Sequence, residues 1–155
     1  MKISPLLIAL GFAISSLDAG QHAREMSKEV DGQKLGYWLH VPAGEAPAEG
    51  WPVLLFLHGA GERGDNLDRV KVHGPPKLIQ KVDELSHAVV ISPQCPKENW
   101  WVARTLMQLL REVIAGLGTS VDLNRVYVTG LSMGGYGSWD LLSKYPDFFA
   151  AAAPI

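Results

Sequence analysis

The chain has 155 residues, of which 47% are hydrophobic and 19% are charged, and its formal net charge is −2. This composition is typical of a folded chain of one domain and argues against intrinsic disorder, nucleic-acid binding and attachment to an anionic membrane surface. The single cysteine, Cys95, excludes an intrachain disulfide and a cysteine-based metal cluster, and the five histidines are scattered, so no metal site is predicted.

Residues 1–20 have the layout of a secretory signal peptide. Lys2 gives a positive start, residues 6–14 form an apolar run, and small residues follow up to Gly20. The apolar run is too short to span a bilayer, so no stable membrane anchor is expected. We therefore predict a secreted or periplasmic protein. A buried apolar N-terminal helix is the alternative.

The next elements read as a lead-in, a hairpin arm and a loop. Residues 21–29 are polar and are expected to lack regular structure. Asp31 and Gly32 form a tight-turn dipeptide, and the alternating apolar pattern of residues 34–41 predicts a half-buried strand, the second arm of a hairpin. Residues 42–52 are rich in Pro, Ala and Gly, which indicates a loop.

Three short apolar runs, at residues 53–57, 88–91 and 125–129, are typical of strands buried on both faces of a parallel sheet. Residues 122–124 form a turn-like opening to the third run, and residues 148–155 look like a further strand.

Helical segments are expected between these strands. Leucines and valine recur with helical spacing from Leu106 to Leu117, residues 76–85 allow a shorter helix, and residues 135–145 allow another. Strands that alternate with helices predict an α/β fold with a mostly parallel sheet and flanking helices.

The most specific motif surrounds Ser132. Residues 130–134 read GLSMG and lie between the third apolar strand and the helix predicted over residues 135–145. A serine on such a sharp strand-to-helix turn adopts a strained backbone conformation that lifts its hydroxyl above the sheet. Glycine at positions 130 and 134 leaves the room that this turn requires, which predicts a nucleophilic serine.

A second motif, HGAG at residues 58–61, directly follows the first buried strand. A glycine-rich loop at the carboxyl end of a central parallel strand lies on the edge where open α/β sheets bind ligands. Its backbone N–H groups, together with the N–H of Met133, are expected to form an oxyanion hole.

Together these motifs resemble the α/β-hydrolase family. The longer strings LHGAGERGDN, HGPPK, SPQCP followed by WW, and VTGLSMGGYGSWDL are similar to its secreted esterase branch, which includes phospholipase/carboxylesterase, polyhydroxybutyrate-depolymerase-like and prolyl-oligopeptidase-like enzymes. The resemblance covers residues 35–155. It implies that Ser132 is the nucleophile and that the N–H groups of Met133 and Ala60 bind the oxyanion.

The same resemblance implies hydrolysis of a small-molecule or polymeric carboxylic ester through an acyl-enzyme, with no cofactor. A serine peptidase of the prolyl-oligopeptidase type is the alternative activity. The sequence indicates no oligomeric state.

The chain departs from the family in its catalytic triad, which runs Ser, then Asp or Glu, then His along the chain. No histidine follows Ser132, and Asp140 and Asp147 come too early to be the acid. We therefore expect residues 21–155 to be the N-terminal portion of one hydrolase domain, with the acid and histidine beyond Ile155. The alternative is a truncated, catalytically inactive chain.

Several other residues have a functional and a structural interpretation. His58 is expected to hold the HGAG loop by local hydrogen bonds, and Cys95 to fill space in the core. Trp100 and Trp101 could line a substrate pocket or cap the core beneath their loop. Residues 62–66 could shape the substrate entrance or form a solvated charged loop.

Overall fold

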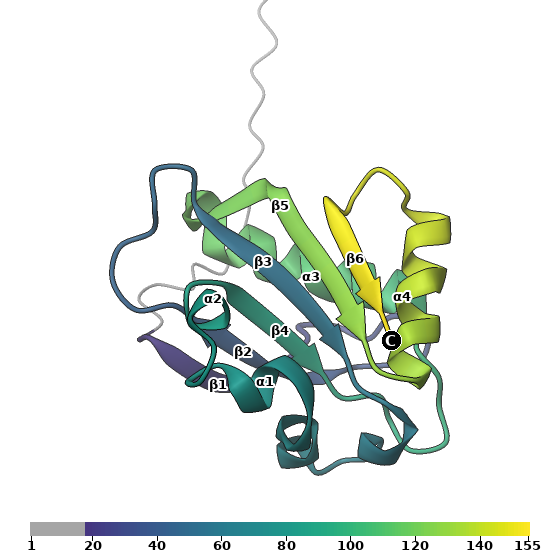
Figure 1. Cartoon of the computed structure of the whole chain (residues 1–155). Coiled ribbons are helices and arrows are strands. Elements are labelled where there is room, and N and C mark those ends of the chain that lie inside the picture. The colour runs from purple at the N-terminus through teal and green to yellow at the C-terminus, as the bar shows by residue number, and fades with distance from the viewer. Residues whose placement is uncertain (1–17) are drawn as a thin grey trace, which may run out of the picture.

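The computed structural model describes residues 18–155, which form one six-stranded sheet with helices on both faces (Figure 1). The strands, in chain order, are β1 Gly20–Glu25, β2 Gly36–Val41, β3 Trp51–Leu57, β4 Val89–Pro93, β5 Val121–Gly130 and β6 Ala151–Pro154. Their order across the sheet is β1-β2-β4-β3-β5-β6. Residues 1–17, which make up most of the predicted signal peptide, lie outside the described part.

The four strands β4, β3, β5 and β6 are parallel, and this half of the sheet confirms the α/β fold expected from the apolar runs. Every residue of β4 is buried, as expected for a strand covered on both faces. The register of β3 against β5 shifts between Trp51 and Val53, which pair with Val121 and Val126. The turn-like residues 122–124 therefore form an irregularity within β5 and do not precede it.

The other half of the sheet is antiparallel: β2 pairs with β4, and β1 pairs with β2. The hairpin is confirmed, since Asp31 and Gly32 both have positive φ, 49° and 73°, at the turn. The prediction of a loose lead-in over residues 21–29 is wrong, because β1 occupies Gly20–Glu25. This edge strand is only partly buried, so its sequence carries no apolar alternation.

Helices α3 (Ala103–Leu117) and α4 (Met133–Lys144) lie on one face, with α1 (Gly74–Leu78) and α2 (Asp83–Ser86) on the other (Figure 1). The short 3-10 helices are η1 Ala60–Glu62, η2 Leu67–Val72 and η3 Gly118–Ser120. The single helix expected over residues 76–85 is wrong: α1 and α2 are separated by a turn at residues 79–81.

The main core lies between the sheet and α3. Leu106, Leu109 and Leu110 of α3 are fully buried, together with Leu55 and Leu57 of β3. This confirms the helical pattern read from the sequence, and burial of each such side chain contributes about 1.5–3 kcal/mol. A smaller cluster on the opposite face packs against α1 and α2.

The strand expected over residues 148–155 is shorter, because only Ala151–Pro154 pair with β5. Phe148 and Phe149 instead pack partly buried against the main core, with their rings edge to face. In the described part of the chain, no helix combines the length and apolar character needed to cross a membrane.

Candidate active site

The candidate site lies where β3, β4 and β5 end at the same edge of the sheet. Ser132 occupies the turn between β5 and α4, with φ 54° and ψ −112°. A non-glycine residue in such a conformation costs about 1–3 kcal/mol and persists only where its surroundings hold it. The Ser132 N–H donates to Ile155 O at 2.6 Å, and the Leu131 N–H donates to Leu57 O at 3.0 Å. The strained turn predicted for Ser132 is confirmed.

Glycines beside this turn allow the backbone to pack closely. A Cβ on Gly130 would overlap the backbone of Gly134, and a Cβ on Gly134 would overlap the carbonyl of Leu57. The same holds for Gly135, whose added Cβ would reach the carbonyl of Ile155. The turn therefore needs glycine at these positions, as the sequence predicted. Their close backbone contacts pack α4 against the ends of β3 and β6.

The HGAG loop lies against this turn. A Cβ on Gly59 would be 3.8 Å from Ser132 Cβ and 3.4 Å from Leu131 O. In residues 18–155, neither the Ala60 N–H nor the Met133 N–H donates to a backbone or side-chain acceptor. Met133 is the first residue of α4, where helix N–H groups lack intrahelical partners. The turn and the loop thus leave two backbone donors free beside a strained serine.

His58 is 1% exposed and uses both ring nitrogens locally. Its Nε2 accepts from the Cys95 N–H at 3.0 Å, so its Nδ1 carries the proton and donates to Gly59 O at 2.6 Å. Burial lowers the pKa of His58, which favours this neutral form. These bonds confirm the interpretation of His58 as a residue that holds the loop, and leave neither nitrogen free to act as a base.

Residues 62–66 are mixed in their exposure. The Glu62 carboxylate is mostly covered, 3.9 Å from His58 Nδ1 and 3.9 Å from His73 Nε2, while Asp65 and Asn66 are exposed. Glu62 therefore belongs to the edge of the site, whereas the end of the segment is solvated.

The two adjacent tryptophans, Trp100 and Trp101, differ clearly in burial. Trp101 is 7% exposed, its Nε1 donates to His58 O at 3.2 Å, and its ring lies edge to face with the His58 ring. The packing interpretation therefore applies to Trp101. Trp100 is 60% exposed, so of the two rings this one is open to solvent.

Cys95 is fully buried, and burial raises the pKa of its thiol to about 11, which fits the predicted role of a core filler. Within residues 18–155, no three His, Cys, Asp or Glu side chains gather in a way that could hold a metal ion. Gln94, whose side chain bonds Glu62 O and Asn66 O, belongs to no recognisable motif, so the sequence alone predicts no role for it.

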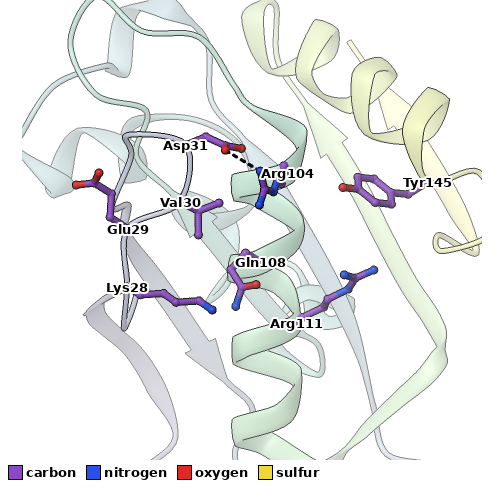
Figure 2. Close-up of a pocket in the computed structure, with 8 residues that line it drawn as sticks. All are labelled: Lys28, Glu29, Val30, Asp31, Arg104, Gln108, Arg111 and Tyr145. Atoms are coloured by element: carbon purple, nitrogen blue, oxygen red, sulfur yellow. Dashed lines mark hydrogen bonds and ion pairs between the residues drawn. The ribbon is translucent and has the colours of Figure 1, made fainter.

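A pocket of about 440 Å³ lies elsewhere on the molecule, and Figure 2 shows the side chains that line it. Its lining residues come from the turn before β2, from α3 and from the end of α4: Lys28, Glu29, Val30, Asp31, Arg104, Gln108, Arg111 and Tyr145. Tyr145 follows the last residue of α4, about 20 Å along the helix from Ser132. The pocket contains none of the predicted site residues.

Comparison with known proteins gives consistent relatives, although no protein-family model matches the chain. The chain is 27% identical to a poly(3-hydroxyoctanoate) depolymerase of Pseudomonas fluorescens, over 97% of this chain and 58% of the depolymerase. It is 28% identical to a bifunctional acetylxylan esterase/xylanase, XynS20E, of Neocallimastix patriciarum, over 79% of this chain and 18% of that protein.

Solved structures agree with these relatives. The crystal structure of a thermostable esterase superposes with a TM-score of 0.76 and 31% identity, over 86% of this chain and 40% of the esterase. An S-formylglutathione hydrolase, FrmB, of Staphylococcus aureus has a TM-score of 0.66 at 15% identity, over 87% of this chain and 56% of that chain, and shows the shared fold alone. The chain therefore spans less than two thirds of each of these four proteins.

Proposed function

We propose that this chain, which belongs to the α/β-hydrolase esterases, is the nucleophile-bearing part of a serine hydrolase that cleaves carboxylic esters. The observation that supports this most is the strained conformation of Ser132 at a strand-to-helix turn. Within residues 18–155, two backbone N–H groups without an acceptor lie in the segments that meet at this turn, which is the arrangement that acyl transfer requires.

In the proposed reaction, Ser132 Oγ attacks the ester carbonyl while a histidine removes its proton. The N–H groups of Met133 and Ala60 donate to the oxyanion, the C–O bond to the alcohol breaks, and the histidine returns the proton to the departing alcohol. Water then attacks the acyl-enzyme with the same histidine as base, which releases the acid and restores Ser132.

The histidine and the acid that orients it are proposed to lie beyond Ile155. His58, the buried histidine next to the site, uses both ring nitrogens in structural hydrogen bonds, and no histidine follows Ser132 in the sequence. The relatives are longer than this chain, which leaves room in them for further residues of the domain. Loss of the base lowers the rate of such enzymes by several orders of magnitude, so the 155-residue chain alone is expected to be nearly inactive.

The substrate class proposed is a small-molecule or polymeric carboxylic ester. A named depolymerase and a named acetylxylan esterase among the relatives support an ester substrate. Exposed Trp100, at the same edge of the sheet as Ser132, is proposed to contact the substrate. Residues 1–20 are proposed to direct export, which N-terminal sequencing of the protein recovered from the periplasm or medium tests.

The deciding experiment compares this chain with a longer product that includes the coding sequence past the Ile155 codon. A fluorophosphonate probe labels only an activated serine, so we expect labelling of the longer protein, loss of labelling in Ser132→Ala, and almost none in the 155-residue chain. Hydrolysis of short esters and of peptide anilides, measured in parallel, separates the esterase from a peptidase. A folded longer protein that is not labelled would contradict the proposed function.

A further inference from the structure

The loop that follows β3 carries Ala60, and it is hydrogen-bonded to the loop that follows β4. We call residues 58–66 the oxyanion loop. Cys95 contributes two of the bonds: its N–H donates to His58 Nε2 at 3.0 Å, and its O accepts from the Gly64 N–H at 3.0 Å. Both ends of the oxyanion loop therefore depend on the segment that begins at the end of β4.

Gln94 supplies the side chain that connects these loops. It is 5% exposed, directly follows the last residue of β4, and its own N–H donates to Gly36 O at 2.8 Å, which fixes its backbone to the sheet. Its Nε2 donates to Glu62 O at 2.8 Å and to Asn66 O at 2.9 Å. One amide thus binds carbonyls on both sides of the turn at residues 63–65.

These two carbonyls lie at structurally informative places. Glu62 is the last residue of η1, the short helix that begins with Ala60, and Asn66 is the residue that caps η2. The Gln94 side chain is buried, and a buried amide N–H without an acceptor carries a substantial free-energy penalty, so the loop conformation that presents both carbonyls to Gln94 is preferred. Because η1 has only three residues, a fixed Glu62 also restricts the direction of the Ala60 N–H.

We infer that Gln94 is a positioning residue that holds the oxyanion loop, and with it the Ala60 N–H, in the orientation needed to bind the oxyanion. This inference rests on the proposed function. An oxyanion donor acts only from about 2.7–3.1 Å, and loss of one donor lowers kcat about 10²–10³-fold. Release of the loop should therefore lower kcat by about tenfold or more and leave KM within about threefold.

The test uses Gln94→Met, which has nearly the same length and volume but no N–H donors. The matched control is Gln21→Met, because Gln21 is partly buried and its Nε2, like that of Gln94, donates to a backbone carbonyl, Pro76 O, at 3.0 Å. Gln21 lies in edge strand β1, outside the segments that form the candidate site. Ester hydrolysis is measured in the longer protein, and hydrogen exchange of residues 60–66 is measured in the longer protein and in the 155-residue chain.

We expect Gln94→Met to lower kcat selectively and to speed exchange in the oxyanion loop, with neither effect in Gln21→Met. Wild-type kcat and exchange in Gln94→Met, or equal losses in both variants, would overturn the inference. If Gln94→Met does not fold, Gln94→Asn, whose amide is one methylene shorter, is judged by the same criteria. If the unmodified longer protein hydrolyses no ester, the proposed function fails, whereas the exchange data still decide whether Gln94 holds the loop.

Discussion

Individual residues at the Ser132 turn are constrained by backbone packing. Gly134 is the most restricted, because an added Cβ would overlap the carbonyl of Leu57 and approach that of His58 to 2.9 Å. Both obstacles are main-chain atoms of β3 and its following loop, which cannot move without disturbing the sheet. Gly134→Ala is therefore expected to lower the free energy of unfolding by about 3 kcal/mol or more.

The measurement is urea unfolding of the 155-residue chain followed by circular dichroism. Gly61→Ala is the matched control, because Gly61 lies in the neighbouring loop with open space at its Cβ position and no positive φ. We expect this control to change the free energy of unfolding by less than about 1 kcal/mol. Equal stability of the two variants would contradict the close approach of α4 to β3.

The buried histidines predict a pH dependence of stability. Burial lowers the pKa of both His58 and His40 in the folded chain, whereas in the unfolded chain a histidine protonates near its ordinary value of about 6.5. Below that pH the unfolded state binds more protons, so stability falls as the pH decreases from about 6.5 towards the lower folded-state values. Each histidine can contribute up to about 1.4 kcal/mol per pH unit.

His58→Gln is expected to weaken this dependence. The measurement is the free energy of unfolding of wild type and variant near neutrality and at mildly acidic pH, with the difference between the two pH values compared within each protein. His40→Gln should reduce the same difference independently, since His40 lies on β2 and bonds Ser86 O through Nε2. An unchanged difference in His58→Gln would show that His58 is not the buried neutral histidine described above.

At the scale of elements, the segment between β4 and α3 contains one structural and one exposed tryptophan. Trp101 packs against His58 and against Gly137 of α4, where an added Cβ would lie 2.8 Å from its ring. Removal of such a buried ring leaves a cavity, so Trp101→Ala is expected to cost about 3–5 kcal/mol. Trp100→Ala should cost less than about 0.5 kcal/mol, because surface substitutions rarely cost more.

Urea unfolding of both variants measures this difference, and ester kinetics of the longer protein add the functional comparison. If Trp100 contacts the substrate as proposed, Trp100→Ala raises KM while stability stays near that of wild type. A stable Trp101→Ala variant would contradict its placement in the core.

The elements that the sequence predicted well are those whose burial is symmetrical or periodic. β3 and β4 are covered on both faces, and α3 buries one stripe. The apolar pattern of each element therefore follows from which of its faces are buried, and the sequence predicts them well. β1 was missed because its partner is a single strand and its side chains remain largely in water. The break between α1 and α2 carries neither proline nor glycine, which left no signal to read.

Some residues of the candidate site could likewise be predicted from the sequence and others could not. Ser132 and its glycines were predictable, because a strained turn restricts residue type at fixed spacing. Gln94 was not predictable, since its role depends on hydrogen bonds to carbonyls 28 and 32 residues away in the chain. The separation of Trp100 from Trp101 also required the fold, because adjacent residues of one type differ only in the direction of their side chains.

At the scale of the molecule, the two edges of the sheet differ. One edge is β1, whose exposed residues are Ala23, Arg24 and Glu25, and the other is β6, whose three alanines are exposed beside α4. On α4, Tyr136 and Trp139 are 71% and 63% exposed, and Ile155 follows β6 with 75% exposure. An unpaired strand edge next to exposed apolar side chains favours association with other chains.

We therefore expect the 155-residue chain to associate as its concentration rises. Sedimentation velocity over an about tenfold range of concentration measures this, because association through an exposed apolar surface increases with the concentration of the chain. Trp139→Lys combined with Tyr136→Lys should shift the chain towards the monomer. Leu123→Lys is the matched control, because Leu123 is 65% exposed but lies at the irregular start of β5. Association that persists in the α4 variant and disappears in the Leu123 variant would place the association surface at the start of β5. A chain that stays monomeric at all concentrations would show that the exposed edge does not drive self-association.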